Sequence, residues 1–212
     1  MTSKVNRYIF HKIVCAVRDL PRTFRRLPTP RLIMTLLVKN EEELLEKNLL
    51  FHKAMGVDAF IVTDNNSADG TYGIIEKYRR KGWVVDVIRE TATGYEQKEW
   101  VDRMIWRAKT SFGADWVINA DADEFWSKAV RPVTDLEAYD LSLYSLFERQ
   151  NRKVIHRTDG YLQISMGNHK VRMLPQYAKS SAIRVYHYNV RGRRQFMDKM
   201  VNGGVQLKEH KG

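Results

Sequence analysis

From Arg31 onward, apolar stretches of strand length alternate along the chain with stretches of helical periodicity. Four apolar runs are typical of buried strands, at residues 32–38, 59–63, 83–88 and 116–118. Helical patterns occupy residues 41–55 and 96–112 and the segment that carries Ile74, Ile75 and Tyr78. This alternation predicts parallel strands joined by right-handed helical crossovers. We therefore expect an α/β fold with a mostly parallel, Rossmann-like sheet flanked by helices.

The pattern weakens after Phe125 and predicts a smaller mixed region. We expect helices near residues 135–148 and 195–201, and short strands near residues 161–164 and 183–188.

The first thirty residues differ from the rest because they are strongly basic. Apolar residues recur there at near-helical spacing, namely Val5, Ile9, Ile13, Val17 and Leu20. This spacing predicts an amphipathic helix that ends at Pro21. Two interpretations stay open: the helix lies on an anionic membrane surface, or it docks on its own domain.

Composition narrows the class of protein. The chain has 212 residues, a formal net charge of +11 and one cysteine, Cys15. One cysteine excludes an internal disulfide and favours a reducing compartment, so we expect a cytoplasmic location. No apolar run approaches the roughly 20 residues that a membrane helix needs. The charge indicates an anionic partner, whether nucleic acid, membrane or phosphorylated substrate.

Acidic side chains follow two of the predicted strands. Asp121, Asp123 and Glu124 come directly after the strand at 116–118, and Asp64 and Asp69 follow the strand at 59–63. In sheets of this kind, ligands bind beyond the carboxyl ends of the strands. Carboxylates bind Mg²⁺ or Mn²⁺ together with the phosphates of a substrate, so the sequence predicts a site for a nucleotide diphosphate. An isolated Asp-X-Asp is more often a solvated loop.

Other polar residues in the second acidic turn have a structural interpretation. Ser67, Asp69 and Thr71 are residue types that cap a following helix.

Three motifs in order resemble the signature of family 2 glycosyltransferases with the GT-A fold. They are Leu36-Leu37-Val38-Lys39-Asn40-Glu41-Glu42, then Asp64-Asn65-Asn66-Ser67-Ala68-Asp69-Gly70-Thr71, then Asp121-Ala122-Asp123-Glu124-Phe125. Further pieces, Gly167-Asn168-His169, Tyr186-His187-Tyr188 and residues 191–204, are similar to a bacterial subgroup of that family. The resemblance implies a nucleotide-sugar-binding half at 31–126 and an acceptor-side half with a C-terminal helix at 127–212.

The resemblance also implies roles for individual residues. Asp64 would lie near the nucleotide base, Asp121 near the ribose or pyrophosphate, and Asp123 would bind Mn²⁺ or Mg²⁺ with His187, His169 being a weaker candidate. The rest of the site for a UDP-sugar or GDP-sugar donor would comprise Val38, Asn40, Glu41 and Asn66, with Arg191, Arg194 and Lys199 neutralising the diphosphate. Trp126 and Tyr161 are candidates for stacking on a sugar.

The implied activity is metal-dependent, inverting transfer of a sugar to a glycan or lipid-linked acceptor. Such transfer needs a carboxylate base for the acceptor hydroxyl, and Asp159, Glu148 and Glu124 are the candidates. Residues 1–30 would hold the enzyme peripherally at the inner membrane face.

Two other functions remain open. A nucleotidyltransferase of similar fold would bring a Gly-rich, basic phosphate loop after the first strand, where this chain has Lys39-Asn40-Glu41-Glu42. A nucleic-acid-binding module would use the +11 charge, but acidic turns repel a polyanion, and we expect no nucleic-acid partner.

Overall fold

The computed structural model describes residues 2–23, 28–91, 96–128, 153–176 and 183–187. Its helices are α1 (Thr2–Thr23), α2 (Leu45–Ala54), α3 (Thr71–Arg80), α4 (Gln97–Thr110) and the short 3₁₀ helix η3 (Met166–Asn168). Its strands are β1 (Leu32–Val38), β2 (Ala59–Asp64), β3 (Val84–Arg89), β4 (Trp116–Asp121), β5 (Glu124–Lys128), β6 (Ile155–Arg157), β7 (Tyr161–Ile164), β8 (Val171–Met173) and β9 (Ile183–His187).

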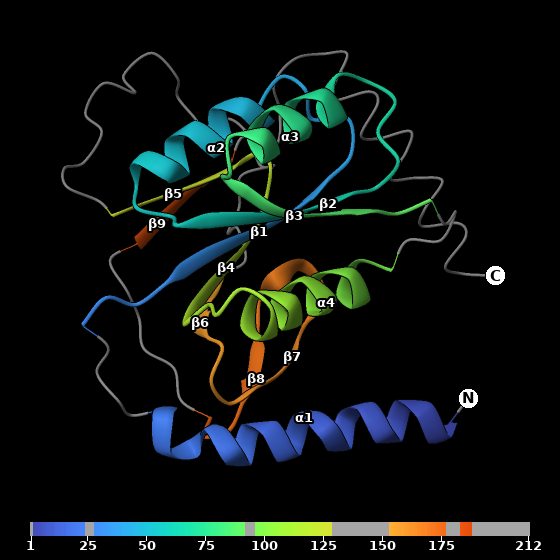
Figure 1. The fold of residues 1–212 in the computed structure, drawn as a ribbon, viewed down its shortest axis with the longest axis vertical. Coiled ribbons are helices and arrows are strands. Elements are labelled where there is room, and N and C mark those ends of the chain that lie inside the picture. Colours follow the sequence, from blue (N-terminus) through green and yellow to red (C-terminus); the bar gives the residue numbers. More distant parts are fainter. Residues whose placement is uncertain (1, 24–27, 92–95, 129–152, 177–182, 188–212) are drawn as a thin grey trace, which may run out of the picture.

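A five-stranded sheet in the order β3-β2-β1-β4-β6 forms the centre of the molecule (Figure 1). β1 to β4 are parallel, and β6 pairs antiparallel with β4. The chain proceeds from β1 outward to β2 and β3 and then returns to place β4 on the other side of β1. The predicted α/β fold with a mostly parallel, helix-flanked sheet is confirmed, and β1 and β4 form the point at which the strand order reverses.

Each face of the sheet carries its own hydrophobic core, because side chains alternate along every strand. On β1, Met34, Leu36 and Val38 pack with residues of α2 and α3, whereas Ile33 packs with Val101, Met104 and Ile105 of α4 and with Tyr161 and Ile164 of β7. Figure 1 shows α2 and α3 on one side of the sheet and α4 with β7 and β8 on the other.

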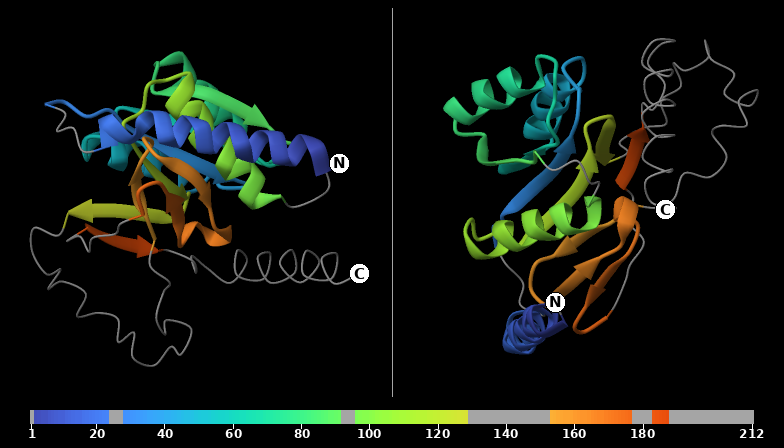
Figure 2. Two further views of the ribbon diagram at one scale, coloured as in Figure 1. Left: turned by 90° about the horizontal axis from the view of Figure 1, so that it is seen from below. Right: turned by 90° about the vertical axis from the view of Figure 1, so that its right-hand side faces the viewer.

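Two small antiparallel pairs flank this core (Figure 2). β5 pairs with β9 and lies against α2, while β7 pairs with β8 and lies against α1 and α4. The first pair matters for the site because it continues directly from the end of β4.

Most of the predicted boundaries hold within two residues, but the end of β4 and the start of α2 do not. β4 continues to Asp121 rather than ending at residue 118. α2 begins at Leu45 rather than at residue 41. The backbone N–H of Glu41 donates instead to the Thr71 hydroxyl at 2.7 Å, so this segment is bound to the start of α3.

The first helix does not end at Pro21 as expected but continues for two more residues, to Thr23. A proline in the last turn removes only one helical hydrogen bond, and Arg157 Nη2 donates to the carbonyl of Arg22 at 3.2 Å, which holds that turn. The helices expected at 135–148 and 195–201 lie outside the described residues. Among the helices described, none is both long and apolar enough to cross a bilayer.

Candidate functional site

The carboxyl ends of β2, β1 and β4 bring the two predicted acidic turns to one edge of the sheet. Val38 at the end of β1 pairs with Asp64, and its neighbour Leu37 pairs with Asp121. Asp64 and Asp121 are therefore two strands apart, about 10 Å between backbones. That spacing suits the two parts of a nucleotide that lies across the end of β1.

The acidic turn itself connects β4 to β5. Asp121 ends β4, Ala122 and Asp123 form the turn, and Glu124 begins β5. Because Glu124 lies opposite His187 on β9, the antiparallel pair brings the His187 ring to the turn, with Nε2 3.2 Å from Asp123 Oδ1. The hydrogen bond to Asp123 raises the pKa of His187 against the opposing effect of burial. The two residues implied as metal ligands are thus adjacent.

Lys153, which the sequence analysis did not single out, joins the remaining two acids. Its Nζ lies 2.7 Å from Glu124 Oε1 and 3.3 Å from Asp121 Oδ2. Burial, followed by the nearby Asp121 charge, raises the pKa of Glu124. Burial opposes the charge on Lys153, but the two carboxylates outweigh it and raise the Lys153 pKa. No pattern around Lys153 indicates this role, because the contact joins segments about thirty residues apart in the sequence.

Two buried polar residues of α2 hold the backbone of the acidic turn. Asn48 Nδ2 donates to the carbonyl oxygens of Ala122 and Glu124, both at 2.9 Å. One helical turn later, His52 Nε2 accepts the backbone N–H of Trp126 at 3.0 Å, while Nδ1 donates to the Asn48 carbonyl at 2.9 Å. Their spacing of four residues on the apolar face of a helix is a sequence signal that could have found them.

Asp64 is fully buried at the end of β2. Its Oδ1 accepts the backbone N–H of Ser67 at 3.2 Å. Among the residues described, Oδ2 has no hydrogen-bond partner, and the nearest cation is Arg89, with Nε at 4.0 Å. An unpaired buried carboxylate oxygen is costly, so this atom is suited to accept a hydrogen bond from a ligand.

The loops after β1 and β2 are bound to each other. The Asn40 N–H donates to Ser67 Oγ at 3.0 Å, and Asn40 Oδ1 accepts the Ala68 N–H at 2.8 Å. Ser67 and Thr71 therefore hold the loop after β1 and do not cap α3 as expected, although Asp69 Oδ1 does accept the Thr71 N–H at 3.0 Å.

Asn40 and Asn66 both adopt left-handed backbone conformations, with φ of 55° and 51°. Glu41 lies in the same pair of loops, and Val38 is buried beneath them. These four predicted donor-site residues thus lie at the carboxyl edge.

Asp159 is not at this edge, which corrects its assignment as a base. β6 runs antiparallel to β4 with Arg157 opposite Trp116, so the following Asp159 lies at the amino end of β4. It is there 3.6 Å from the Arg157 guanidinium, roughly 15 Å of strand away from Asp121. Of the other candidates, Glu148 lies outside the described residues, and Glu124 is buried with Lys153 at the turn.

Tyr161 and Trp126 are packing residues, which corrects their proposed stacking on a sugar. Tyr161 is buried, stacks on His156 and donates to Asp102 Oδ1 at 2.6 Å. Trp126 is 5% exposed and belongs to the core beneath α2. His169 follows η3 between β7 and β8, on the α4 side of the sheet. Arg191, Arg194 and Lys199 lie outside the described residues.

The donor set at the turn is compatible with a divalent cation. Within the described parts of the chain, no three His, Cys, Asp or Glu side chains are arranged to hold a metal ion. Asp123 and His187 supply one carboxylate and one imidazole. A cation such as Mn²⁺ or Mg²⁺ commonly takes one or two protein ligands and completes its shell with substrate phosphates and water.

No protein family model matches the sequence, and a search of curated proteins finds no match. Several solved structures are similar to part of this chain. One is the mannosyltransferase PcManGT from Pyrobaculum calidifontis, in complex with GDP-Man and Mn²⁺, at 16% identity over 59% of this chain and 39% of that chain, with a TM-score of 0.35.

Another is glucosyl-3-phosphoglycerate synthase from Mycobacterium tuberculosis, in complex with Mn²⁺, UDP and phosphoglyceric acid, at 19% identity over 49% of this chain and 40% of that chain, with a TM-score of 0.32. This chain spans about two fifths of the length of these proteins.

Proposed function

We propose that this protein is a metal-dependent glycosyltransferase that uses a nucleotide diphosphate sugar. The observation that carries the proposal is the contact between Asp123 and His187, 3.2 Å apart at the carboxyl edge where the strand order reverses. The ordered motifs of the sequence resemble family 2 glycosyltransferases and supply the chemical class of the donor.

In this proposal the two acidic turns bind different parts of the donor. Asp64 Oδ2, which has no hydrogen-bond partner among the described residues, accepts a hydrogen bond from the base or ribose. Asp121, on the other side of β1, lies near the ribose or pyrophosphate. Asp123 and His187 would hold Mn²⁺ or Mg²⁺. When bound, this metal ion stabilises negative charge on the departing diphosphate.

The geometry of the turn keeps these groups in place during transfer. Lys153 lies between Asp121 and Glu124 and limits repulsion between their carboxylates. Arg191 and Lys199 remain predicted partners of the diphosphate. The acceptor hydroxyl of a glycan or lipid-linked precursor attacks the anomeric carbon in line, its proton passes to a carboxylate base, and the bond to the diphosphate breaks with inversion of configuration. Residues 1–30 hold the protein at a membrane surface.

Ligand-dependent thermal stability tests the proposal. We expect UDP or GDP to raise the melting temperature in the presence of Mn²⁺ and to have little effect after chelation. Asp123→Asn and His187→Gln should abolish the metal-dependent part of the rise in melting temperature. Glu76→Gln, which removes an acid on α3, should retain it. Nucleotide stabilisation that is unchanged by Mn²⁺ and by both site substitutions would refute the metal role.

The reaction products distinguish sugar transfer from nucleotidyl transfer. A glycosyltransferase releases a nucleoside diphosphate from the nucleotide sugar, whereas a nucleotidyltransferase releases pyrophosphate from a nucleoside triphosphate. Mn²⁺-dependent pyrophosphate release from a triphosphate and a sugar phosphate, without nucleoside diphosphate release from any nucleotide sugar, would favour the second activity.

A further inference from the structure

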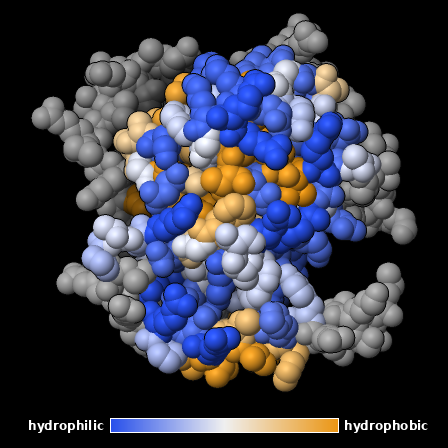
Figure 3. Space-filling view, in the orientation of Figure 1, coloured by the Kyte–Doolittle hydropathy of each residue, from blue (hydrophilic) through white to orange (hydrophobic). Residues whose placement is uncertain are grey.

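The first helix exposes its apolar side chains. Tracing α1 around its axis, with about 100° per residue, places five of its apolar positions on one continuous arc. The exposed members of this apolar arc are Ile9, Phe10, Ile13, Val14 and Val17, each between 44% and 67% exposed. The space-filling view shows apolar surface over α1 along the lower edge of the molecule (Figure 3). A patch of this kind on a helix usually marks a contact surface.

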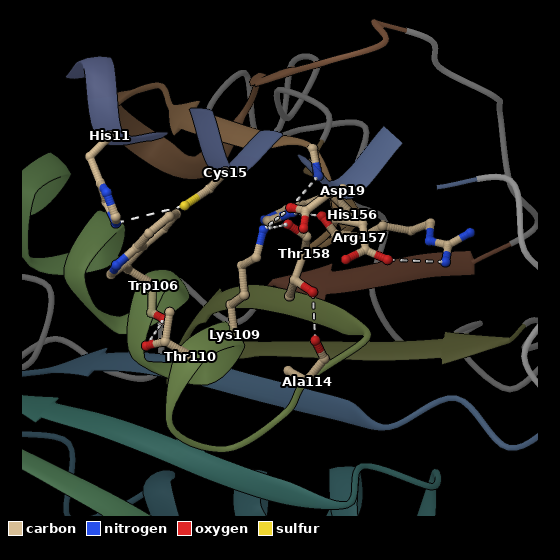
Figure 4. A network of polar contacts seen from close by, with 12 residues as sticks. His11, Cys15, Asp19, Trp106, Lys109, Thr110, Ala114, His156, Arg157 and Thr158 are labelled. Atoms are coloured by element: carbon tan, nitrogen blue, oxygen red, sulfur yellow. Dashed lines mark hydrogen bonds and ion pairs between the residues drawn. The ribbon is translucent and has the colours of Figure 1, made fainter. Parts of the chain in front are cut away.

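Polar contacts, in contrast, fix the inner side of the same helix. Lys12 is only 4% exposed and lies 2.5 Å from Asp102 of α4, and Tyr8 donates to the same carboxylate at 3.1 Å. About two turns further on, buried Asp19 is ion-paired with Lys109 (Figure 4). A helix that docked on its domain by hydrophobic burial would show the opposite arrangement.

Basic side chains border the apolar arc on both sides. On one border lie the exposed side chains of Arg18 and Arg22, with His11 near them. On the other border, Ile9 and Ile13 line an open cavity of about 600 Å³ together with Lys98, Arg172 and Glu99, and with Lys12, which is ion-paired with Asp102. An apolar strip with a basic border on one side and a mixed border of net positive charge on the other matches the acyl chains and the anionic headgroups of a lipid surface.

We propose that α1 is a lipid-binding helix that lies in the plane of an anionic membrane surface. Phe10, Val14 and Val17 enter the boundary between headgroups and acyl chains, and Arg18, Arg22, Lys98 and Arg172 contact lipid phosphates. The buried contacts of Lys12 and Asp19 keep the helix attached to the domain while its outer face binds lipid. This surface fits the lipid-linked acceptor proposed above, but its evidence is independent of sugar transfer.

The arrangement of the fold sets the orientation on the membrane. Both α1 and the β7–β8 pair lie on the α4 side of the sheet, and α2 and α3 lie on the opposite side (Figure 1). With α1 on the lipid surface, α4 faces the membrane and α2 and α3 face away from it.

Vesicle sedimentation of the full chain tests the proposal directly. We expect the protein to bind vesicles of phosphatidylcholine mixed with phosphatidylglycerol, and to bind pure phosphatidylcholine at least tenfold more weakly. The triple variant Phe10→Ser, Val14→Ser, Val17→Ser should lower the partition coefficient on mixed vesicles at least tenfold. Arg18→Gln with Arg22→Gln should lower it severalfold and weaken its salt dependence.

A matched control distinguishes binding through this surface from nonspecific hydrophobic binding to vesicles. Leu50, within α2, and Met55, just beyond its end, are 47% and 51% exposed, so Leu50→Ser with Met55→Ser removes similar apolar surface elsewhere. The control should bind vesicles like the wild type. Equal loss in both variants, or full binding by the triple variant, would overturn the proposal.

A second measurement reports insertion without relying on the triple variant. Phe10→Cys in a Cys15→Ser background, labelled with an environment-sensitive fluorophore, should shift its emission to the blue on addition of mixed vesicles. An unchanged emission would contradict insertion. Sedimentation velocity completes the test: a wild-type dimer that dissociates in the triple variant would make a second copy the occupant and refute the lipid assignment.

The nucleotide experiment distinguishes the two proposals. The triple variant should retain the same Mn²⁺-dependent stabilisation by nucleotide as the wild type, because the apolar arc lies on the opposite side of α4 from the sheet. Asp123→Asn should lose nucleotide stabilisation but still bind vesicles. That result would support the lipid-binding surface whether or not the protein transfers sugar.

Discussion

Asn48 on α2 donates from its side-chain amide to the carbonyl oxygen of Glu124 at 2.9 Å, and a second hydrogen bond of the same length reaches Ala122. One amide thereby holds both sides of the turn that presents Asp123. The position of Asp123 thus depends on the packing of α2.

Asn48→Leu should destabilise the protein by about 2–3 kcal/mol, because two buried carbonyl oxygens lose their donor. It should also weaken Mn²⁺-dependent nucleotide stabilisation, because Asp123 is no longer held toward His187. Urea unfolding and thermal shift measure the two effects. Lys47→Ala, at the exposed neighbouring position, is the control, and an equal nucleotide response in both variants would argue against a positioning role.

Asp64→Asn should affect nucleotide binding much more than stability. The amide retains an oxygen for the Ser67 N–H and relieves the burial of a charge, but it loses the 4.0 Å ion pair with Arg89, so the ligand-free protein should stay within about 1 kcal/mol of the wild type. Nucleotide affinity, measured by calorimetry with Mn²⁺, should fall at least tenfold. Unchanged affinity would remove Asp64 from the donor site.

Lys153→Met should cost about 3–5 kcal/mol near pH 8, because it leaves Asp121 and buried Glu124 without their shared cation. The raised pKa of Glu124 would rise further, so protonation at acidic pH should recover part of the loss. A double-mutant cycle with Glu124→Gln checks the pairing, since the double variant should be more stable than Lys153→Met alone. Additive losses would show that the two residues do not interact.

Two buried histidines predict a loss of stability in acid. Burial lowers the pKa of both His52 and His156 to about 4, from 6.5. The unfolded chain therefore binds protons at these histidines more readily than the folded protein does. The free energy of unfolding is highest above pH 6.5 and falls as the pH approaches 4, by up to about 3 kcal/mol per histidine. Urea unfolding across this range measures the loss.

His52→Gln keeps an acceptor and a donor but cannot titrate. Its unfolding free energy should therefore fall less than that of the wild type between pH 6.5 and 4, even if it is lower at pH 7. A parallel decline in both proteins would exclude His52 as a source of the acid sensitivity.

Local pattern predicted the sheet well. The strands Leu32–Val38 and Tyr161–Ile164 have the predicted bounds. β2, β3 and β4 each begin within one residue of their predicted starts. Apolar alternation and strand length are local properties, and the order of strands and helices restricts the topology. Helix ends were less predictable, because the start of α2 depends on a hydrogen bond from Glu41 to Thr71, the first residue of α3.

The sequence by itself determined that acidic turns follow β2 and β4, and that such turns share one edge of a parallel sheet. Only the tertiary structure decided which polar residues join them. Lys153 and Asn48 reach the turn from distant segments, while the antiparallel course of β6 carries Asp159 to the opposite edge. The same holds for α1, whose periodicity established an amphipathic helix but not which face would be buried. Lys12 and Asp19 decide that, because their partners Asp102 and Lys109 lie on α4, about ninety residues away in the sequence.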